Sequence, residues 1–391
     1  MTAETVRLAD CCEIVSGATP RRDHPEYWGG DIAWVTPKDI RDLDGAILAD
    51  TPEHITKAGY ESCSTHLLPE GSVLFSSRAP IGLVAVTGRE MCTNQGFKSL
   101  IPGPDVDAGY LYWCLKREAP RIAAKSSGTT FTEISRKGME QVKIPLPPLP
   151  EQRRIAAILD KTAAVRRKRE QTLDLADQFL RSVFLDLFGD PVTNPRGWPV
   201  KKLQELIDPE RPITYGILKP GPDEPEGVPY VRVVDMADEM IKVHALRRTT
   251  REIAEKYRRS KLQKVDVLLS IRGHVGRLAL VPAELAGANI TQDTARLAAS
   301  PDILPEYLLG ALSTSGLQQW MARCVKGGAV KGINLGDVKM IPIAVPPRDK
   351  QERFAQTYRA MRSVRVLEVK LVGRLDALHG SLTQRAFRGD I

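Results

Sequence analysis

The most distinctive polar residues of the sequence lie in a short frame, V-L-x-S-x-R-x-x-x-G, which occurs at residues 73–82 and again at 267–276. Each copy places a serine two positions before an arginine, first as Ser76 and Arg78 and then as Ser270 and Arg272. A guanidinium group has several N–H donors in a fixed plane, so it suits paired hydrogen bonds to nucleobase edges and contacts with phosphates. The two arginines therefore predict binding chemistry at two equivalent places.

Motifs for catalysis are missing from the sequence. There is no G-x-x-x-x-G-K-[ST] phosphate loop and no Gly-rich strand-turn-helix that would hold a cofactor. The tetrapeptide [DNS]-P-P-[FY], typical of amino-methyltransferases that grip a flipped base, is absent as well. No C-x-x-C pair occurs and the six histidines are scattered, so no metal site or disulfide framework is indicated. The triplet at residues 368–370, Glu-Val-Lys, lies in a predicted helix without a partnered acid.

Charge and hydropathy limit the class of protein further. The formal net charge is +8 and the sequence pI is about 9.1, which favours a polyanionic partner such as nucleic acid. No apolar run approaches the roughly 20 residues that span a bilayer. The first residues lack the pattern of a secretory signal, so the cytoplasm is the expected compartment.

The sequence is a tandem repeat. Pro147-Pro148 corresponds to Pro346-Pro347 at an offset of 199 residues, and the two copies of the Ser-Arg frame precede these prolines in the same order. Each unit is too long for a solenoid repeat, so a duplicated domain is predicted. Further pairs at the same offset are Gln152 and Gln351, Arg154 and Arg353, Ala156 and Ala355, Ser182 and Ser381, and Phe188 and Phe387.

Each proline-rich segment leads into a long helix. The prolines of residues 144–150 predict an extended lead-in, with Pro150 just before or in the first helical turn of a helix over residues 151–188. Its later apolar positions follow steps of three and four residues, at Leu173, Ala176, Leu180, Val183 and Leu187. The second copy has apolar positions at Phe354, Tyr358, Met361, Val364, Leu367, Leu371, Leu375, Leu378 and Leu382. We expect the two helices to pair as an antiparallel coiled coil; the alternative is that each packs only on its own globule.

The predicted fold class is α+β, with two pseudo-symmetric α/β domains separated by two long helices that form an antiparallel coiled coil. Short β-rich runs at residues 71–77 and 265–271, and helices near residues 110–117 and 306–314, support this class. The expected boundaries are a first globular domain over residues 1–146, hinge and helix over 147–190, a second globular domain over 191–343, and hinge and helix over 344–391.

Several of these segments together resemble the specificity (S) subunits of type I restriction-modification systems. The resemblance rests on IPLPPLPEQRRIAAILDK at residues 144–161, FGDPVTNPRGWPVKKLQEL at 188–206, VLFSSRAPIG at 73–82, TNQGFKSL at 93–100 and SGTTFTEIS at 127–135. It implies that each globule is a target recognition domain for one half of a bipartite DNA site. It also implies that the helices set the spacer and dock methyltransferase (M) subunits, that restriction (R) subunits can join, and that S-adenosylmethionine and ATP with Mg belong to those partners.

The resemblance and the chemistry of base and phosphate contacts select candidate residues. The candidate DNA-binding residues are Arg21, Arg22, Lys38, Ser77, Arg78, Lys98 and Thr129 in the first domain and Arg232, Arg272, His274, Arg296, Lys326 and Lys331 in the second. The candidate partner-binding or spacer residues on the helices are Gln152, Arg154, Ile155, Leu159, Leu180, Gln351, Phe354 and Leu375. Trp34 and Tyr230 occupy equivalent positions and are expected in the cores.

Two other functions remain open from the sequence. The chain could be a coiled-coil scaffold that joins two protein-binding globules without DNA, or a self-sufficient modification enzyme, against which the missing motifs argue. The second copy also departs from the resemblance, because its hinge reads PPRDKQERFA at residues 346–355 and its counterpart of residues 127–135 lacks the Thr-Phe pair.

Overall fold

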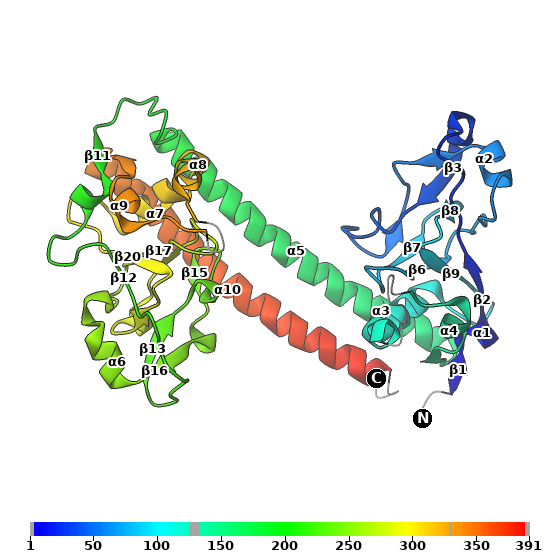
Figure 1. Cartoon of the computed structure of the whole chain (residues 1–391). Coiled ribbons are helices and arrows are strands. Elements are labelled where there is room, and N and C mark those ends of the chain that lie inside the picture. The colour runs from blue at the N-terminus through cyan, green and yellow to red at the C-terminus, as the bar shows by residue number, and fades with distance from the viewer. Residues whose placement is uncertain (1–3, 125–132, 328–330, 388–391) are drawn as a thin grey trace. The chain divides into compact units, whose positions relative to one another are not determined.

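The chain forms two compact units in the computed structural model, which describes residues 4–124, 133–327 and 331–387 (Figure 1). Unit 1 combines Met1–Glu170 with Lys370–Ile391, and unit 2 is Gln171–Val369. Unit 1 therefore contains both ends of the chain, whereas unit 2 is continuous in sequence.

Unit 1 is built on two sheets and a strand pair. One sheet has, in spatial order, β2 (Cys12–Ser16), β9 (Phe97–Pro102), β6 (Val73–Ser76), β7 (Val84–Thr87) and β4 (Ile47–Leu48). The other has β5 (His54–Ile55), β3 (Trp28–Val35) and β8 (Met91–Thr93), and the pair is β1 (Thr5–Arg7) with β10 (Lys143–Pro145). Its short helices are α1 (Leu8–Cys11), α2 (Lys57–Glu61), α3 (Ala108–Ala124), α4 (Arg136–Glu140) and the 3₁₀ turn η1 (Pro25–Tyr27).

Unit 2 has a corresponding set of elements. Its larger sheet has the order β12 (Thr214–Tyr215), β20 (Thr294–Leu297), β17 (Val267–Ser270) and β18 (Leu278–Leu280). The smaller sheet is β16 (Arg247–Thr249), β13 (Val228–Val231) and β19 (Asn289–Ile290), and the strand pairs are β14 (Met236–Ala237) with β15 (Met240–Ile241) and β11 (Val200–Lys202) with β21 (Pro342–Ala344). The helices are α6 (Arg251–Lys256), α7 (Pro305–Ser313), α8 (Ser315–Cys324) and α9 (Leu335–Lys339), with 3₁₀ turns η2 (Leu203–Leu206), η3 (Val233–Asp235), η4 (Val243–Ala245), η5 (Arg258–Ser260) and η6 (Ala283–Leu285).

The strand pairings confirm the duplicated, pseudo-symmetric fold. In unit 1, β3 pairs antiparallel with β5 and parallel with β8; in unit 2, β13 pairs antiparallel with β16 and parallel with β19. The frames at 73–82 and 267–276 begin with β6 and β17, each antiparallel to both neighbours. Trp34 on β3 and Tyr230 on β13 are both 2% exposed, which confirms their core positions. The same topology therefore occurs twice.

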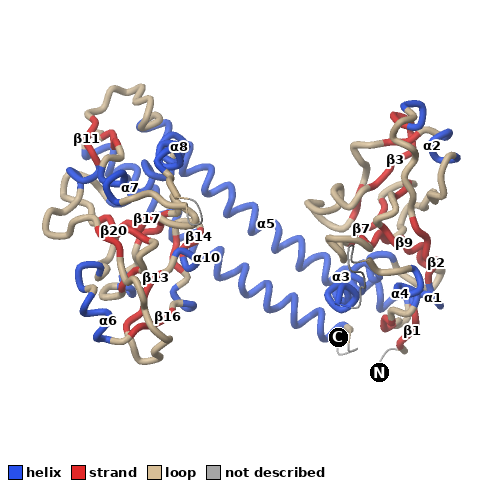
Figure 2. The backbone as a smooth tube through the Cα atoms, viewed as in Figure 1, coloured by secondary structure: helices blue, strands red, loops and turns tan. Residues whose placement is uncertain are grey.

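Two long helices follow the proline-rich segments, as predicted. The first, α5, runs over Leu149–Phe188 for 40 residues, and the second, α10, runs over Arg348–Ala386 for 39 residues (Figure 2). Pro150 lies in the first turn of α5, where a proline is tolerated because its missing N–H would have no helical partner. Glu151 follows it near the positive end of the helix dipole.

The helices pair antiparallel within each unit. In unit 1, Thr162 Oγ1 lies 2.7 Å from His379 Nδ1, and Arg166 donates to Asp376 at 2.9 Å. In unit 2, Arg365 donates to Asp177, and Phe184 stacks edge-on against Phe354 with ring centroids 5.2 Å apart. In both units the partner position on α10 falls as the position on α5 rises, which confirms the antiparallel arrangement.

Burial along α10 corrects the predicted seam. Val364, Leu367 and Leu378 were expected on it, but their side chains are 43%, 57% and 48% exposed. Arg365 and Glu368 are only 9% and 7% exposed. The prediction considered only apolar residues, but the buried positions of this helix include charged ones. In the middle of the helix, the predicted apolar stripe therefore does not coincide with the buried face. On α5, the apolar side chain of Val165 is 38% exposed.

The end of each long helix completes a core. Phe188, at the C-terminal end of α5, packs in unit 2 against Tyr307, with ring centroids 4.8 Å apart. Phe387, directly after α10, packs in unit 1 against Tyr110 at 5.6 Å. The two phenylalanines are equivalent in the repeat, and so are the two tyrosines.

Candidate nucleic-acid interface

The repeated Ser-Arg frame folds into the same turn in both units. In unit 1, Ser76 Oγ donates to Pro80 O at 2.7 Å and accepts from Leu83 N at 2.8 Å. The N–H of Gly82 donates to Ser76 O at 3.0 Å, and Gly82 has a φ of +94°, which glycine adopts without strain. The serine thus closes the turn that presents Arg78.

Unit 2 repeats this hydrogen bonding. Ser270 Oγ donates to His274 O and accepts from Arg277 N at 2.8 Å. Gly276 donates to Ser270 O at 3.0 Å and also has a φ of +94°. Arg272 therefore follows β17 in the same way that Arg78 follows β6. The serines and glycines of the frame stabilise the turn, and the arginine side chain makes no hydrogen bond within it.

The two arginines have different neighbours. The isolated β-bridge beside the turn joins Arg78 to Glu133 in unit 1 and Arg272 to Gly332 in unit 2. Arg78 Nε donates to the Glu133 carboxylate at 2.9 Å, whereas Arg272 Nη1 donates to Gln292 Oε1 at 3.3 Å. A glycine in place of the glutamate leaves Arg272 without a carboxylate partner among the described residues.

Glu133 also binds a second cation. Lys98 Nζ donates to its carboxylate at 3.0 Å, and the lysine side chain is only 8% exposed. Burial by itself would raise the pKa of Glu133, but the hydrogen bonds from Lys98 and Arg78 outweigh burial and lower that pKa. The carboxylate is therefore charged at neutral pH and reduces the net positive charge of the unit 1 turn.

The other candidates in unit 1 differ in accessibility. Arg22 is exposed, forms a two-point ion pair with Glu53 and lies 3.8 Å above the Trp28 ring. Arg21 pairs with Asp23 at 2.8 Å and Lys38 is exposed. Ser77 is buried, and its Oγ has no hydrogen-bond partner among the described residues. Thr129 lies outside the described residues.

The candidates of unit 2 form a surface group and a second, less exposed group. Arg272, His274, Lys326 and Lys331 are exposed. A cavity of about 650 Å³ is lined by Arg272, Gln292, Asp293, Lys326, Gly327, Gly332, Ile333 and Asn334. The structure thus brings two candidate cations together at one opening.

The second group of unit 2 consists of Arg296, which is buried, and Arg232, which is half-buried. Arg296 is 3% exposed, donates to Pro212 O at 2.9 Å, and has a pKa lowered by burial. Arg232 donates from Nε and Nη2, along one edge of its guanidinium, to the Asp235 carboxylate at 2.9 and 2.7 Å. Both guanidinium groups are held by hydrogen bonds within unit 2.

Most helix candidates fix a helix to its own globule. Gln152 is fully buried and bonds Asp107 N, Asp105 O and Pro147 O, each at 2.8 Å. Gln351 makes the equivalent bonds with Leu304 N and Pro346 O. Ile155, Leu159 and Phe354 are core residues of their units, Leu180 packs on the unit 2 core, Leu375 is half-buried, and Arg154 pairs with Glu151.

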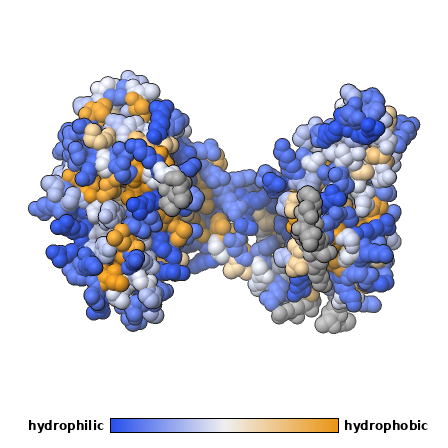
Figure 3. All heavy atoms as spheres, viewed as in Figure 1, coloured by the Kyte–Doolittle hydropathy of each residue, from blue (hydrophilic) through white to orange (hydrophobic). Residues whose placement is uncertain are grey.

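Unit 2 exposes apolar side chains that sequence reasoning missed. Of the 18 large hydrophobic residues exposed within the described chain, 14 lie in unit 2, and hydrophobic patches are visible on its surface in Figure 3. On the long helices, Leu175 and Phe179 are 63% and 50% exposed and were not predicted, whereas Leu367, predicted on the buried seam, is 57% exposed. Leu175 and Phe179 flank the predicted seam one position away, which is the signal that could have found them.

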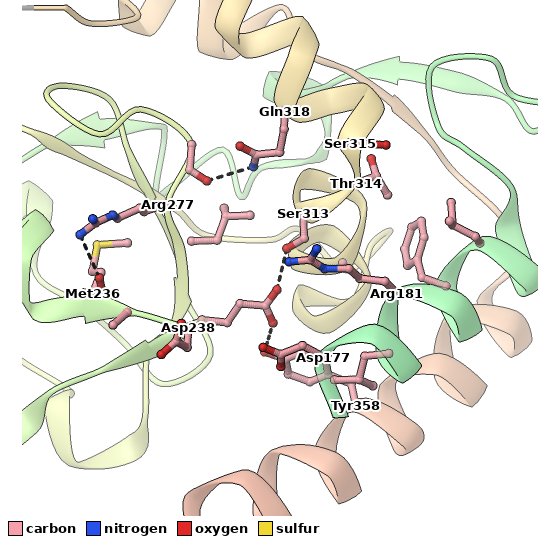
Figure 4. A pocket seen from close by; sticks show the side chains of 18 of the residues that line it. Asp177, Arg181, Met236, Asp238, Arg277, Ser313, Thr314, Ser315, Gln318 and Tyr358 are labelled. Atoms are coloured by element: carbon pink, nitrogen blue, oxygen red, sulfur yellow. Dashed lines mark hydrogen bonds between the residues drawn. The ribbon is translucent and has the colours of Figure 1, made fainter. Parts of the chain in front are cut away.

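A cavity of about 800 Å³ lies in unit 2 between α5, α7, α8, α10 and the β14–β15 hairpin (Figure 4). Glu239 at the hairpin tip has a φ of +59° and accepts hydrogen bonds from Ser313 at 2.8 Å and Tyr358 at 3.2 Å. Burial raises the pKa of Glu239 more than these bonds lower it. The carboxylate fastens the hairpin to α7 and α10.

Comparison with known proteins identifies the family. Residues 2–174 and 195–360 match the type I restriction modification DNA specificity domain. The chain belongs to this family. The match covers both repeats and most of the sequence.

Individual relatives agree with the family match. The type I restriction enzyme MjaIX specificity subunit of Methanocaldococcus jannaschii is 32% identical over 251 residues, which cover 58% of this chain and 56% of that protein. The EcoBI specificity subunit of Escherichia coli is 28% identical over 312 residues, 72% of this chain and 65% of that protein. The matches thus span less than two thirds of either relative. The solved S subunit from M. genitalium shares the fold with a TM-score of 0.62 at 14% identity, covering 98% of this chain and 96% of that one.

Within the described residues we find neither a candidate metal site nor a candidate membrane-spanning helix. No group of three or more His, Cys, Asp or Glu side chains there could hold a metal ion. No helix in that part of the chain is both long and apolar enough to cross a membrane.

Proposed function

We propose that this chain is the DNA sequence-recognition subunit of a type I restriction-modification complex. Each repeat reads one half of a bipartite target, and the paired helices set the unread spacer between the halves. The observation that carries the proposal is the recurrence of one hydrogen-bonded turn with Arg78 in unit 1 and Arg272 in unit 2, within a chain of the specificity family. A guanidinium on a rigid turn suits paired bonds to guanine in the major groove.

The DNA surface in this proposal consists of the exposed candidates around the two turns. Residues beneath them, namely Ser77, Lys98, Arg232 and Arg296, support the turns. The proposed boundaries at residues 146, 190 and 343 separate two target recognition domains from their hinges and helices. The proposed compartment is the cytoplasm.

Methyltransferase subunits are the proposed protein partners, with restriction subunits joining through them. The exposed apolar side chains of Leu175, Phe179 and Leu367 on the long helices support such docking, because a protein interface needs an apolar centre. S-adenosylmethionine and ATP with Mg would be bound by those partners, and this chain contributes no catalytic group.

The test is a pair of matched substitutions assayed on the target defined by mapping methylated bases in cells with and without this gene. Arg272→Ala should weaken binding of the methyltransferase complex to its cognate duplex by about 1–3 kcal/mol and relax discrimination in one half-site only. Arg78→Ala should act on the other half-site with a smaller loss, because Glu133 already binds that guanidinium.

Arg7→Ala, which removes an exposed arginine paired with Asp10, serves as the control and should leave binding unchanged. If both turn variants bind the cognate duplex like the unaltered chain, the turns do not read DNA. If the unaltered complex prefers no duplex at all, a scaffold without DNA is the better account.

A further inference from the structure

Residues 247–264 of unit 2 form a surface of concentrated positive charge, here called the basic surface. The segment carries eight cationic and two acidic side chains, a net charge of +6, whereas the whole chain carries +8. It comprises β16, α6, η5 and the loop that follows; α6 and β16 lie together at one end of unit 2 (Figure 1). Its cations are Arg247, Arg248, Arg251, Lys256, Arg258, Arg259, Lys261 and Lys264.

The backbone beneath these cations is fixed to the fold. Thr250 caps α6 by accepting a hydrogen bond from Ile253 N at 3.2 Å. Asn289 Nδ2 donates to Tyr257 O and to Ser260 Oγ, both at 3.2 Å, and Ser260 is 1% exposed. The charged side chains therefore project from a rigid support, which reduces the entropy lost when they bind a ligand.

Most of the cations have no internal partner. Lys261 pairs with Glu255 at 2.6 Å, and Arg248 donates to Gly227 O at 2.8 Å. The other cations of the segment are exposed, and none has an acidic side chain within 4.0 Å among the described residues. They are Arg247, Arg251, Lys256, Arg258, Arg259 and Lys264.

The first repeat shows that the fold does not require this charge. β5 and α2 are the counterparts of β16 and α6, with the same strand pairing to the neighbouring strand. The 18 residues that begin with β5, 54–71, contain one lysine and two glutamates, a net charge of −1. The same topology is thus built without the cations, so their presence in unit 2 indicates a partner.

The partner is anionic and has no need of an apolar centre. Protein interfaces bury an apolar core, but none of the exposed large hydrophobic side chains lies within residues 247–264, all of which are described. Duplex DNA presents one negative charge per about 1.7 Å of helix axis and is bound by dispersed Lys and Arg side chains.

We propose that the basic surface binds the phosphate backbone of duplex DNA, in addition to the contacts made at the turn of Arg272. The inference rests on the proposed function and deepens it. Unit 2 supplies more of the charge-dependent affinity, and unit 1 binds its half-site with fewer phosphate contacts. The contacts are independent of base sequence, because phosphates carry no base identity.

The test uses the full chain with its methyltransferase subunits and the cognate duplex, over salt from about 50 to about 300 mM. The triple variant Arg258→Ala, Arg259→Ala, Lys264→Ala should make the slope of log affinity against log salt shallower by about 2–3, since each lost phosphate contact removes about 0.9. Affinity at low salt should fall at least tenfold, while the preference for cognate over altered half-sites stays the same.

The matched control keeps the charge: Arg258→Lys, Arg259→Lys, Lys264→Arg should retain the original slope, and Lys57→Ala on α2 should leave it unchanged. If the triple alanine variant does not fold, Arg251→Gln with Lys256→Gln replaces it, with an expected decrease in slope of about 1–2.

An unchanged slope in a folded variant overturns the proposal. Loss of methyltransferase binding with an unchanged slope also overturns it and assigns the surface to an acidic protein. Failure of the proposed function looks different, because the unaltered complex would then show no preference for the cognate duplex.

Discussion

The two equivalent arginines have different partners, because Glu133 binds Arg78 in unit 1 and no described carboxylate binds Arg272 in unit 2. Arg78 and Arg272 could be found because the frame around them is local and repeated. Glu133 could not, because it reaches Arg78 across 55 positions of the sequence. Glu53, the partner of Arg22, is 31 positions away and was missed for the same reason. The candidate site was thus predictable where turn chemistry sets it and unpredictable where a distant carboxylate modifies it.

Glu239 gives a pH prediction at this scale. Because its folded pKa is raised above the unfolded one, the folded state binds a proton more tightly, and the stability of unit 2 should fall as pH rises from about 4.5 through the folded pKa. Glu239→Gln has no group to titrate at this position, so its free energy of unfolding should fall less than that of the unaltered chain as pH rises, and its pH dependence should be flatter. Urea unfolding from about pH 5 to pH 8 measures both. A variant as pH-dependent as the unaltered chain would contradict the prediction.

At the scale of elements, the start of α5 was predicted to within two residues, but the contacts of the long helices were not. Proline chemistry fixes where α5 begins, and that is local. The buried positions of α10 depend on which charged residues find partners, and an apolar stripe does not reveal this. Turns from the globules add such partners: Asp44 binds Arg167 at 2.9 Å in unit 1, and Asp238 lies 4.0 Å from Arg365 in unit 2.

Substitution of Arg365 tests how much its ion pair with Asp177 contributes to the stability of unit 2. Arg365→Ala leaves the partly buried Asp177 carboxylate without its donor and should reduce the free energy of unfolding of unit 2 by about 2 kcal/mol. Urea unfolding measures the loss. Arg374→Ala, at an exposed position of α10, should cost less than about 0.5 kcal/mol. Adding Asp177→Ala to Arg365→Ala should restore part of the loss, and equal losses for Arg365 and Arg374 would contradict the prediction.

At the scale of the molecule, the tandem duplication predicted both globules, but it did not reveal how the cores are completed. Leu382, Ala386 and Phe387 belong to the core of unit 1, although nearly the whole chain separates them from its first strand. The apolar ends of both helices were visible in the sequence. The core that each end joins depends on the antiparallel pairing, because this pairing places the end of α10 in unit 1.

Phe387→Ala should therefore destabilise the N-terminal unit, by about 3 kcal/mol. The readout is labelling of the Cys114 thiol, which is 1% exposed in the same core as Phe387 and should react faster in the variant. Phe188→Ala is the matched control, because it removes the equivalent ring from unit 2 and should leave Cys114 protected. Equal labelling rates in the two variants would contradict this assignment of the helix ends.

The discontinuous make-up of unit 1 has a consequence for synthesis on the ribosome. Unit 2 has all of its residues once Val369 has emerged, so its core can close while translation is still under way. Most of unit 1 is translated earlier, but its core needs residues 370–387 before Phe387 can reach Tyr110. Although most of unit 1 is translated first, it is then the later of the two units to mature, and a chain cut short after Val369 would contain a complete unit 2 and an unfinished unit 1.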